Sequence, residues 1–126
     1  MKAIEYSEFG APFEVCKCIE VDDPADPQAN EVVVAIEASA INPADLLIIR
    51  GEYPGPDTLP ARQGIEGTGR IIAVGPDVKD YTVGDRVLLL GRGNWAEKVV
   101  CLAEQVVSIP EEIDVLQAAQ MKANPP

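Results

Sequence analysis

Hydrophobic and polar residues alternate along several short segments of the chain, with turn-forming residues between them. In residues 31–41, Val32, Val34 and Ile36 fall on one face, whereas the other face mixes charged and apolar residues. Because successive side chains of a strand point to opposite faces, this period of two predicts a β-strand. Shorter patterns predict further strands, at residues 1–6, 13–21, 64–74, 86–90, 96–102 and 105–109.

A short helix is predicted at the corner that follows residues 31–41. Asn42 precedes Pro43, so its backbone is expected to be extended, and Pro43 suits the first helical position. Asp45 falls in the first turn, where a negative charge complements the helix dipole, and Gly51 is expected to end the helix. We interpret Asp45 as a helix-start residue rather than as an acid catalyst.

A second helix is predicted over residues 111–123. Glu111 and Glu112 fall in its first turn and Lys122 in its last, which matches the helix dipole at both ends. This amphipathic helix has no partner left in the sequence, so we expect that a further domain is missing. About seven or eight short strands and two short helices predict a mainly-β barrel or partly open sandwich.

Composition and charge exclude several classes of function. The 126 residues suit one domain, and the net charge of −11 with ten scattered lysines and arginines leaves no basic stripe for nucleic acid. No apolar run approaches the roughly 18 residues that span a membrane. The first residues lack the apolar core of a signal peptide, so we expect a cytoplasmic location.

The chain has no histidine, which excludes Ser-His-Asp and Cys-His catalysis within it. Its three cysteines, Cys16, Cys18 and Cys101, do not form a secreted disulfide framework. A closed zinc site needs four ligands, so we interpret the cysteines as buried or half-buried small hydrophobic residues. A metal or redox role for them stays open as the alternative.

Residues 91–96 spell G-x-G-x-x-A after a predicted strand, which is the spacing of a dinucleotide-binding fingerprint. Residues 96–102 fit a strand better than the helix that the fingerprint requires. Trp95 is also bulky where such a helix must pack closely, and no βαβ unit precedes it. We therefore predict a tight hairpin at residues 91–96.

Four motifs together resemble the medium-chain dehydrogenases/reductases in content and order: Ala40-Ile-Asn-Pro-Ala-Asp45, Gly64-Ile-Glu-Gly-Thr-Gly69, Val74-Gly-Pro-Asp-Val78 and Val83-Gly-Asp-Arg-Val87. Residues 118–125 are similar to the helix that leads into the nucleotide-binding domain of that superfamily. The resemblance covers nearly the whole chain. It implies that residues 1–126 form a GroES-like, partly open barrel, the catalytic domain, and that a Rossmann domain binding NADPH or NADH is absent.

Departures from the zinc alcohol dehydrogenases indicate the zinc-free branch. Those enzymes carry a Cys near the position of Pro43 and a Gly-His-Glu where this chain has Gly64-Ile65-Glu66, and they have a four-cysteine lobe that is absent here. The zinc-free branch contains quinone oxidoreductases and enoyl thioester reductases. Gly51-Glu-Tyr53 and Gly93-Asn-Trp95 resemble the mitochondrial-type 2-enoyl thioester reductases. The resemblance implies NAD(P)H-dependent reduction of an activated C=C bond in an enoyl thioester or a quinone.

Tyr53 is the catalytic residue that this resemblance implies. Enoyl reduction develops charge on an enolate oxygen, and a phenol can stabilise that charge or donate the proton without a metal. The alternative is a half-buried loop tyrosine with its hydroxyl in water. Tyr6 and Tyr81 fall in a strand and a turn, so we expect them to be structural.

Three further residues are candidates for the site. Asn42 is expected to contact the cofactor, to cap the helix, or both. Glu66 is expected near the substrate pocket, where it would pair with an arginine such as Arg70 or organise the rim of the barrel. Trp95 would line an acyl pocket or cover the core.

The partners follow from the same resemblance. We expect a small-molecule substrate, no nucleic acid and no membrane; self-association into a homo-oligomer stays open. The chain alone is expected to bind no cofactor and to be inactive. The alternative is a freestanding GroES-like binding module without catalysis, in which contact with another copy would cover the end of the 111–123 helix.

Overall fold

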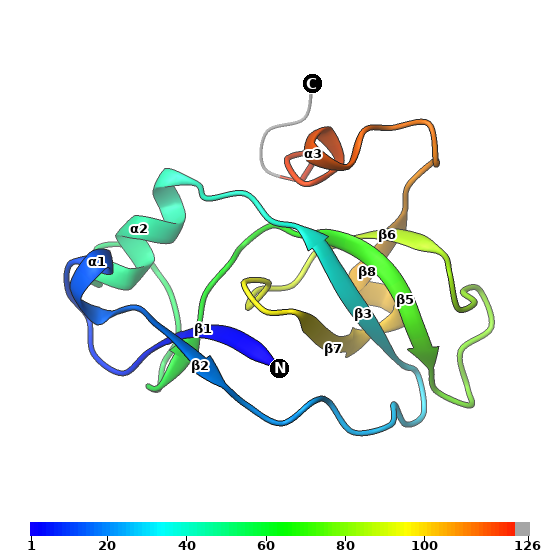
Figure 1. Cartoon of the computed structure of the whole chain (residues 1–126), viewed down its shortest axis with the longest axis horizontal. Helices are drawn as coiled ribbons and strands as arrows, with labels where there is room; N and C mark the ends of the chain where they lie inside the picture. Colours follow the sequence, from blue (N-terminus) through cyan, green and yellow to red (C-terminus); the bar gives the residue numbers. More distant parts are fainter. Residues whose placement is uncertain (123–126) are drawn as a thin grey trace.

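Two antiparallel β-sheets organise the chain in the computed structural model, which describes residues 1–122 (Figure 1). The large sheet has the strand order β7-β3-β5-β6-β8 and the small sheet the order β2-β1-β4. The strands are β1 (Lys2–Tyr6), β2 (Lys17–Glu20), β3 (Glu31–Ala38), β4 (Ala61–Arg62), β5 (Thr68–Val74), β6 (Arg86–Leu89), β7 (Lys98–Leu102) and β8 (Val106–Ser108). This confirms the predicted mainly-β, partly open barrel.

The main core lies on one face of the large sheet. Val32 and Val34 of β3 are fully buried there, as their alternation predicted, and they pack with residues of β5, β6 and β8: Ile71, Val87, Leu89 and Val106. Burying each such side chain stabilises the fold by about 1.5–3 kcal/mol. A smaller cluster of Tyr6, Val15 and Ile49 holds the small sheet against the helices.

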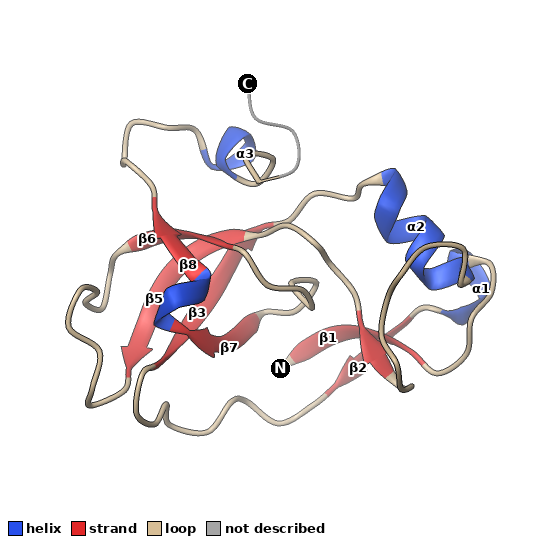
Figure 2. Ribbon diagram, turned by 180° about the vertical axis from the view of Figure 1, so that it is seen from behind, coloured by secondary structure: helices blue, strands red, loops and turns tan. Residues whose placement is uncertain are grey.

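Helix α2 (Pro43–Arg50) forms where the sequence predicted it. Asn42 is extended, with φ −100° and ψ 155°, and Pro43 opens the helix. Gly51 ends it in the left-handed region, with φ 79°, which glycine adopts without steric cost. Figure 2 shows α1 and α2 together beside the small sheet, and α3 over the large sheet.

The predicted strand at residues 13–21 is wrong in its first half. Pro12–Val15 form the short helix α1, and only Lys17–Glu20 pair with β1. Pro12 occupies the first helical position, where its fixed φ and missing N–H favour a helical turn. Val15 is buried at the end of this turn, so packing and proline together override the alternation.

The predicted helix at residues 111–123 is also wrong. Helix α3 covers only Val115–Ala118, with Asp114 as its N-cap, and Ala123 lies outside the described residues. The guanidinium of Arg86 donates to the carbonyl oxygens of Pro110 and Ile113, which fixes the preceding segment as a turn. A 3₁₀ turn, η1 (Ala103–Gln105), was not predicted.

Residues 91–96 do not make the predicted hairpin. Strands β6 and β7 lie at different positions in the large sheet, with β5 and β3 between them. The intervening loop therefore crosses the barrel, and no helix follows it, so the dinucleotide fingerprint is excluded as well. Among residues 1–122, no helix is long and apolar enough to cross a membrane.

Neighbouring isoleucines of β5 test the main core. Ile71 is fully buried, whereas Ile72 on the opposite face is 42% exposed. We expect Ile71→Ala to lower the free energy of unfolding by about 2–5 kcal/mol through lost burial and a cavity. Ile72→Ala is expected to cost about 1 kcal/mol or less. Chemical denaturation of both variants measures this, and equal losses would show that the core lies elsewhere.

Candidate functional site

A buried carboxylate, that of Asp45, joins the start of α2 to the segment before β5. Its Oδ2 accepts from the backbone N–H of Asn42 at 2.9 Å. Its Oδ1 accepts from Nε2 of Gln63 at 2.7 Å and from the N–H of Ile65 at 3.1 Å. Asp45 is fully buried, and Gln63 is 3% exposed. The helix-start role predicted for Asp45 is confirmed, and the carboxylate has a second role in binding residues 63–65.

Asn42 and Glu66 are brought together beside Asp45. Nδ2 of Asn42 donates to Oε2 of Glu66 at 2.6 Å, and Glu66 is fully buried. The predicted pairing of Glu66 with Arg70 is wrong: the half-exposed Arg70 reaches the surface and binds Glu111 with two contacts of 2.7 Å. Glu66 instead bonds Asn42 at the start of α2, and its place near the substrate pocket stays a prediction.

Lys122 closes this group from the C-terminal side. Its ammonium donates to the carbonyl oxygens of Ile65 and Leu90, both at 2.7 Å. Burial lowers the pKa of Lys122, and the carboxylates of Glu66 and Asp45 oppose that shift. We call Asn42, Asp45, Gln63, Glu66 and Lys122 the polar rim. Sequence reasoning missed the roles of Gln63 and Lys122, because both depend on contacts between distant parts of the chain.

Tyr53 lies on the loop after α2 and is 49% exposed. Its hydroxyl makes no hydrogen bond with residues 1–122, whereas the hydroxyl of Tyr6 donates to Gln63 and that of Tyr81 to the carbonyl of Val106. Of the three tyrosines, Tyr53 is thus the one whose hydroxyl has no hydrogen bond within the described part of the chain.

The structure does not place Tyr53 in contact with the polar rim. Asn42 and Gly51 flank the two ends of α2 and lie about 13 Å apart along its axis, because an α-helix rises 1.5 Å per residue. The loop beyond turns back: a Cβ on Gly55 would lie 2.8 Å from a methyl of Ile48. The carbonyl of Pro54 accepts from Arg92 at 3.2 Å. This contact ties the Tyr53 loop to the crossing loop before β7.

Trp95 of the crossing loop packs against the smaller cluster. Its indole N–H donates to the carbonyl of Ala40 at 3.2 Å. Trp95 also lines a cavity of about 220 Å³ beside β1, together with Ile36 and Cys18 but with none of Asn42, Tyr53 and Glu66. The structure supports a packing role, and an acyl-pocket role for Trp95 stays a prediction.

The crossing loop contains a further buried polar residue, Asn94, which belongs to the Gly93-Asn-Trp95 motif but whose burial was not predicted. Its side chain is 1% exposed; Nδ2 donates to the carbonyl of Gly91, while Oδ1 has no partner among residues 1–122. The loop can lie this close because Gly64, with φ 122°, has no side chain on the side that faces it. A Cβ on Gly64 would lie 2.7 Å from Trp95. Gly64 thus keeps the crossing loop against the polar rim.

The three cysteines are free thiols that behave differently. Cys101 packs against the main core, and burial raises its pKa to about 11. Cys16 packs against the smaller cluster, and burial raises its pKa too. Cys18 is exposed, so its predicted burial is wrong. No group of three or more His, Cys, Asp or Glu side chains within residues 1–122 is placed to hold a metal ion.

Two antiparallel sheets with short helices agree with the mainly-β fold of a GroES-like domain. The alcohol dehydrogenase GroES-like domain family matches residues 28–111, about two thirds of the chain. The chain belongs to this family, and thereby to the medium-chain dehydrogenase/reductase superfamily.

Relatives in this superfamily carry the names of reductases. The chain is 34% identical to the mitochondrial enoyl-acyl-carrier-protein reductase of Xenopus tropicalis, over 98% of this chain and 36% of that protein. The structure of a putative NADPH:quinone reductase from Bacillus thuringiensis is 41% identical, with a TM-score of 0.89, covering 98% of this chain and 38% of that one. The Escherichia coli quinone oxidoreductase complexed with NADPH is 35% identical, with a TM-score of 0.83, covering 94% and 36%. The chain spans little more than a third of these relatives.

Removing the Asp45 carboxylate tests whether it holds the polar rim. We expect Asp45→Ala to lower the free energy of unfolding by about 2–4 kcal/mol, because it leaves buried N–H groups without an acceptor. Asp45→Asn, which keeps one carbonyl oxygen, is expected to lose less. Asp57→Ala, at an exposed loop position, is the control and should stay within about 0.5 kcal/mol of the parent. Thermal or chemical unfolding measures all three, and an Asp45→Ala loss as small as the control's would refute the role.

Proposed function

We propose that this chain is the substrate-side domain of a zinc-independent, NADPH-dependent reductase that acts on a C=C bond conjugated to a carbonyl group. The names of the relatives support the class of reaction. The observation that carries the proposal is that Tyr53 is half-exposed, that its hydroxyl has no hydrogen bond within residues 1–122, and that its loop is tied to the crossing loop. Because the chain spans about a third of its relatives, the proposal concerns a longer protein.

Tyr53 would act on the carbonyl oxygen of the substrate. When hydride adds to the β-carbon, negative charge develops on this oxygen, and a phenol O–H placed near it lowers the barrier by donating a hydrogen bond or the proton. A hydroxyl already bonded to the protein would have to break that bond first. Tyr6 and Tyr81 are bonded in this way, which is why they are not proposed for the step.

The side chains of the polar rim suit contact with a nicotinamide cofactor better than the binding of zinc. Asp45 already accepts three N–H groups and Glu66 accepts the amide of Asn42, so neither carboxylate is a ready metal ligand. Zinc sites in enzymes also use histidine or cysteine, and the rim has neither. NADPH would supply the hydride, and Asn42 is the rim residue proposed to lie against it.

The polar rim would then serve as a rigid wall. Its bonds fix the start of α2 and the segment before β5, so the surface that a nicotinamide ring meets is held before the ring arrives. Preorganisation of this kind avoids the cost of ordering the site at the moment of reaction. The rim residues are therefore proposed to position the site, whereas Tyr53 would touch the substrate.

The test is Tyr53→Phe in a full-length protein that joins these residues to a nucleotide-binding domain. We expect turnover of an enoyl thioester or quinone with NADPH to fall by roughly 10²–10⁴-fold, because the phenol no longer donates. Tyr81→Phe is the matched control, since it removes a hydroxyl that donates to the carbonyl of Val106 and not to the site, and its turnover should change by less than about threefold. Turnover is followed by the loss of NADPH absorbance. Equal activity of the two variants would reject Tyr53 as the donor.

A further inference from the structure

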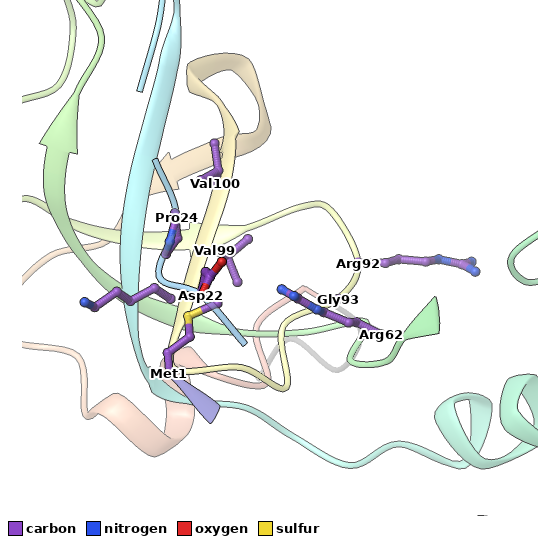
Figure 3. A pocket seen from close by; sticks show the side chains of 9 residues that line it. Met1, Asp22, Pro24, Arg62, Arg92, Gly93, Val99 and Val100 are labelled. Atoms are coloured by element: carbon purple, nitrogen blue, oxygen red, sulfur yellow. The ribbon is translucent and has the colours of Figure 1, made fainter. Parts of the chain in front are cut away.

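A pocket of about 530 Å³ lies beside β7, away from the proposed catalytic residues (Figure 3). Its walls come from the N-terminal residue, the acidic loop before β3, strands β4 and β7, and the crossing loop. The lining residues are Met1, Asp22, Pro24, Arg62, Arg92, Gly93, Lys98, Val99 and Val100. None of Asn42, Tyr53, Glu66 and Trp95 is among them, so the pocket is distinct from the site described above.

The charge of this pocket opposes that of the whole chain. The net charge of the protein is −11, with ten lysines and arginines in 126 residues. Three of these cations, Arg62, Arg92 and Lys98, line the pocket, together with one carboxylate, Asp22. The ammonium of Met1, another lining residue, is already paired with Glu20 and Asp23. A cavity whose walls carry an excess of one sign of charge attracts ligands of the other sign. On an acidic protein, this is therefore a local site of attraction for anions.

The three cations are not equally available. Lys98 is bound to Asp23, and Arg92 donates to the carbonyl of Pro54. The guanidinium of Arg62 makes no hydrogen bond or ion pair with any residue of the described chain. Figure 3 shows its side chain running from β4 towards the side of Met1 and Asp22, whereas Arg92 points the opposite way. Arg62 thus offers its N–H groups to a ligand in the pocket.

The remaining walls limit what that ligand can be. Met1, Pro24, Val99 and Val100 supply apolar surface, which suits a hydrocarbon body. The carboxylate of Asp22 also has no hydrogen bond or ion pair with the described residues, and it would repel additional negative charge. A ligand with one negative charge satisfies Arg62 without that repulsion. A polyanion such as citrate does not.

We propose that this pocket, the Arg62 pocket, binds a small organic carboxylate with an apolar tail. The carboxylate would accept two parallel N–H bonds from Arg62, the geometry in which guanidinium groups bind carboxylates best. The tail would lie along Val99 and Val100. The proposal does not rest on the proposed reductase function, because Arg62, Val99 and Val100 have no role in that chemistry.

The test is a titration of the isotope-labelled protein with hexanoate, followed by the NMR shifts of backbone amides. Low ionic strength is used, since salt screens exposed charges. We expect saturable shifts at Gly93, Val99 and Val100. Hexan-1-ol lacks the negative charge, and citrate carries several. Both should bind at least about tenfold more weakly than hexanoate.

Arg62→Gln and Arg50→Gln form a matched pair of variants. Both arginines are exposed and both changes remove one positive charge, but Arg50 lies at the end of α2, outside the pocket. Arg62→Gln should weaken hexanoate binding about tenfold or more, while Arg50→Gln should leave it within about twofold. Three results would overturn the proposal: no saturation by hexanoate, equal binding of hexan-1-ol, or equal losses in the two variants.

Discussion

The carboxylate of Asp45 is the interaction on which the arrangement of this domain depends. It is buried and accepts N–H groups from the start of α2 and from the segment before β5. Hydrogen bonds to an ionised acceptor are about twice as strong as neutral ones, and a buried charge without them costs several kcal/mol. The chain can therefore bury Asp45 only in an arrangement that brings these segments together.

The bonds of Gln63 extend this connection to the small sheet. While its amide donates to Asp45, its carbonyl accepts from the hydroxyl of Tyr6 in β1 at 3.4 Å. Helix α2 then sets the start of the loop that carries Tyr53, and the Arg92 contact holds this loop from the other side. The hydrogen bonds of Asp45 at the start of α2 thus help to set the position of Tyr53, which follows the end of the same helix.

Local patterns predicted those parts of the molecule that local physics determines. The alternation through Val32 and Val34 found β3, and the Asn42-Pro43 corner gave the start of α2, because proline restricts its own φ and the residue before it. The helix at 111–123 failed because Arg86, far away in the sequence, binds the carbonyls of Pro110 and Ile113. Charges that suit a helix dipole do not show whether the backbone carbonyls are free to make the helix.

The site was predictable only in part for the same reason. Asn42 and Glu66 were named from motifs, but the bond between them spans 24 residues and that of Lys122 to Ile65 spans 57. Glu66 was paired with nearby Arg70, whereas the fold turns Arg70 to the surface and leaves Glu66 buried. Residue type suggests which groups need partners, and the packing of distant segments decides which partners they meet.

Hydrogen exchange of two backbone amides tests the central claim most directly. The N–H groups of Asn42 and Ile65 both donate to Asp45, although neither belongs to a strand or helix. If this carboxylate holds the domain together, both amides should exchange as slowly as sheet amides such as that of Leu89, at least about 10³-fold below the rate of an unstructured chain. Exchange as fast as that of the exposed loop at residues 55–58 would contradict the account.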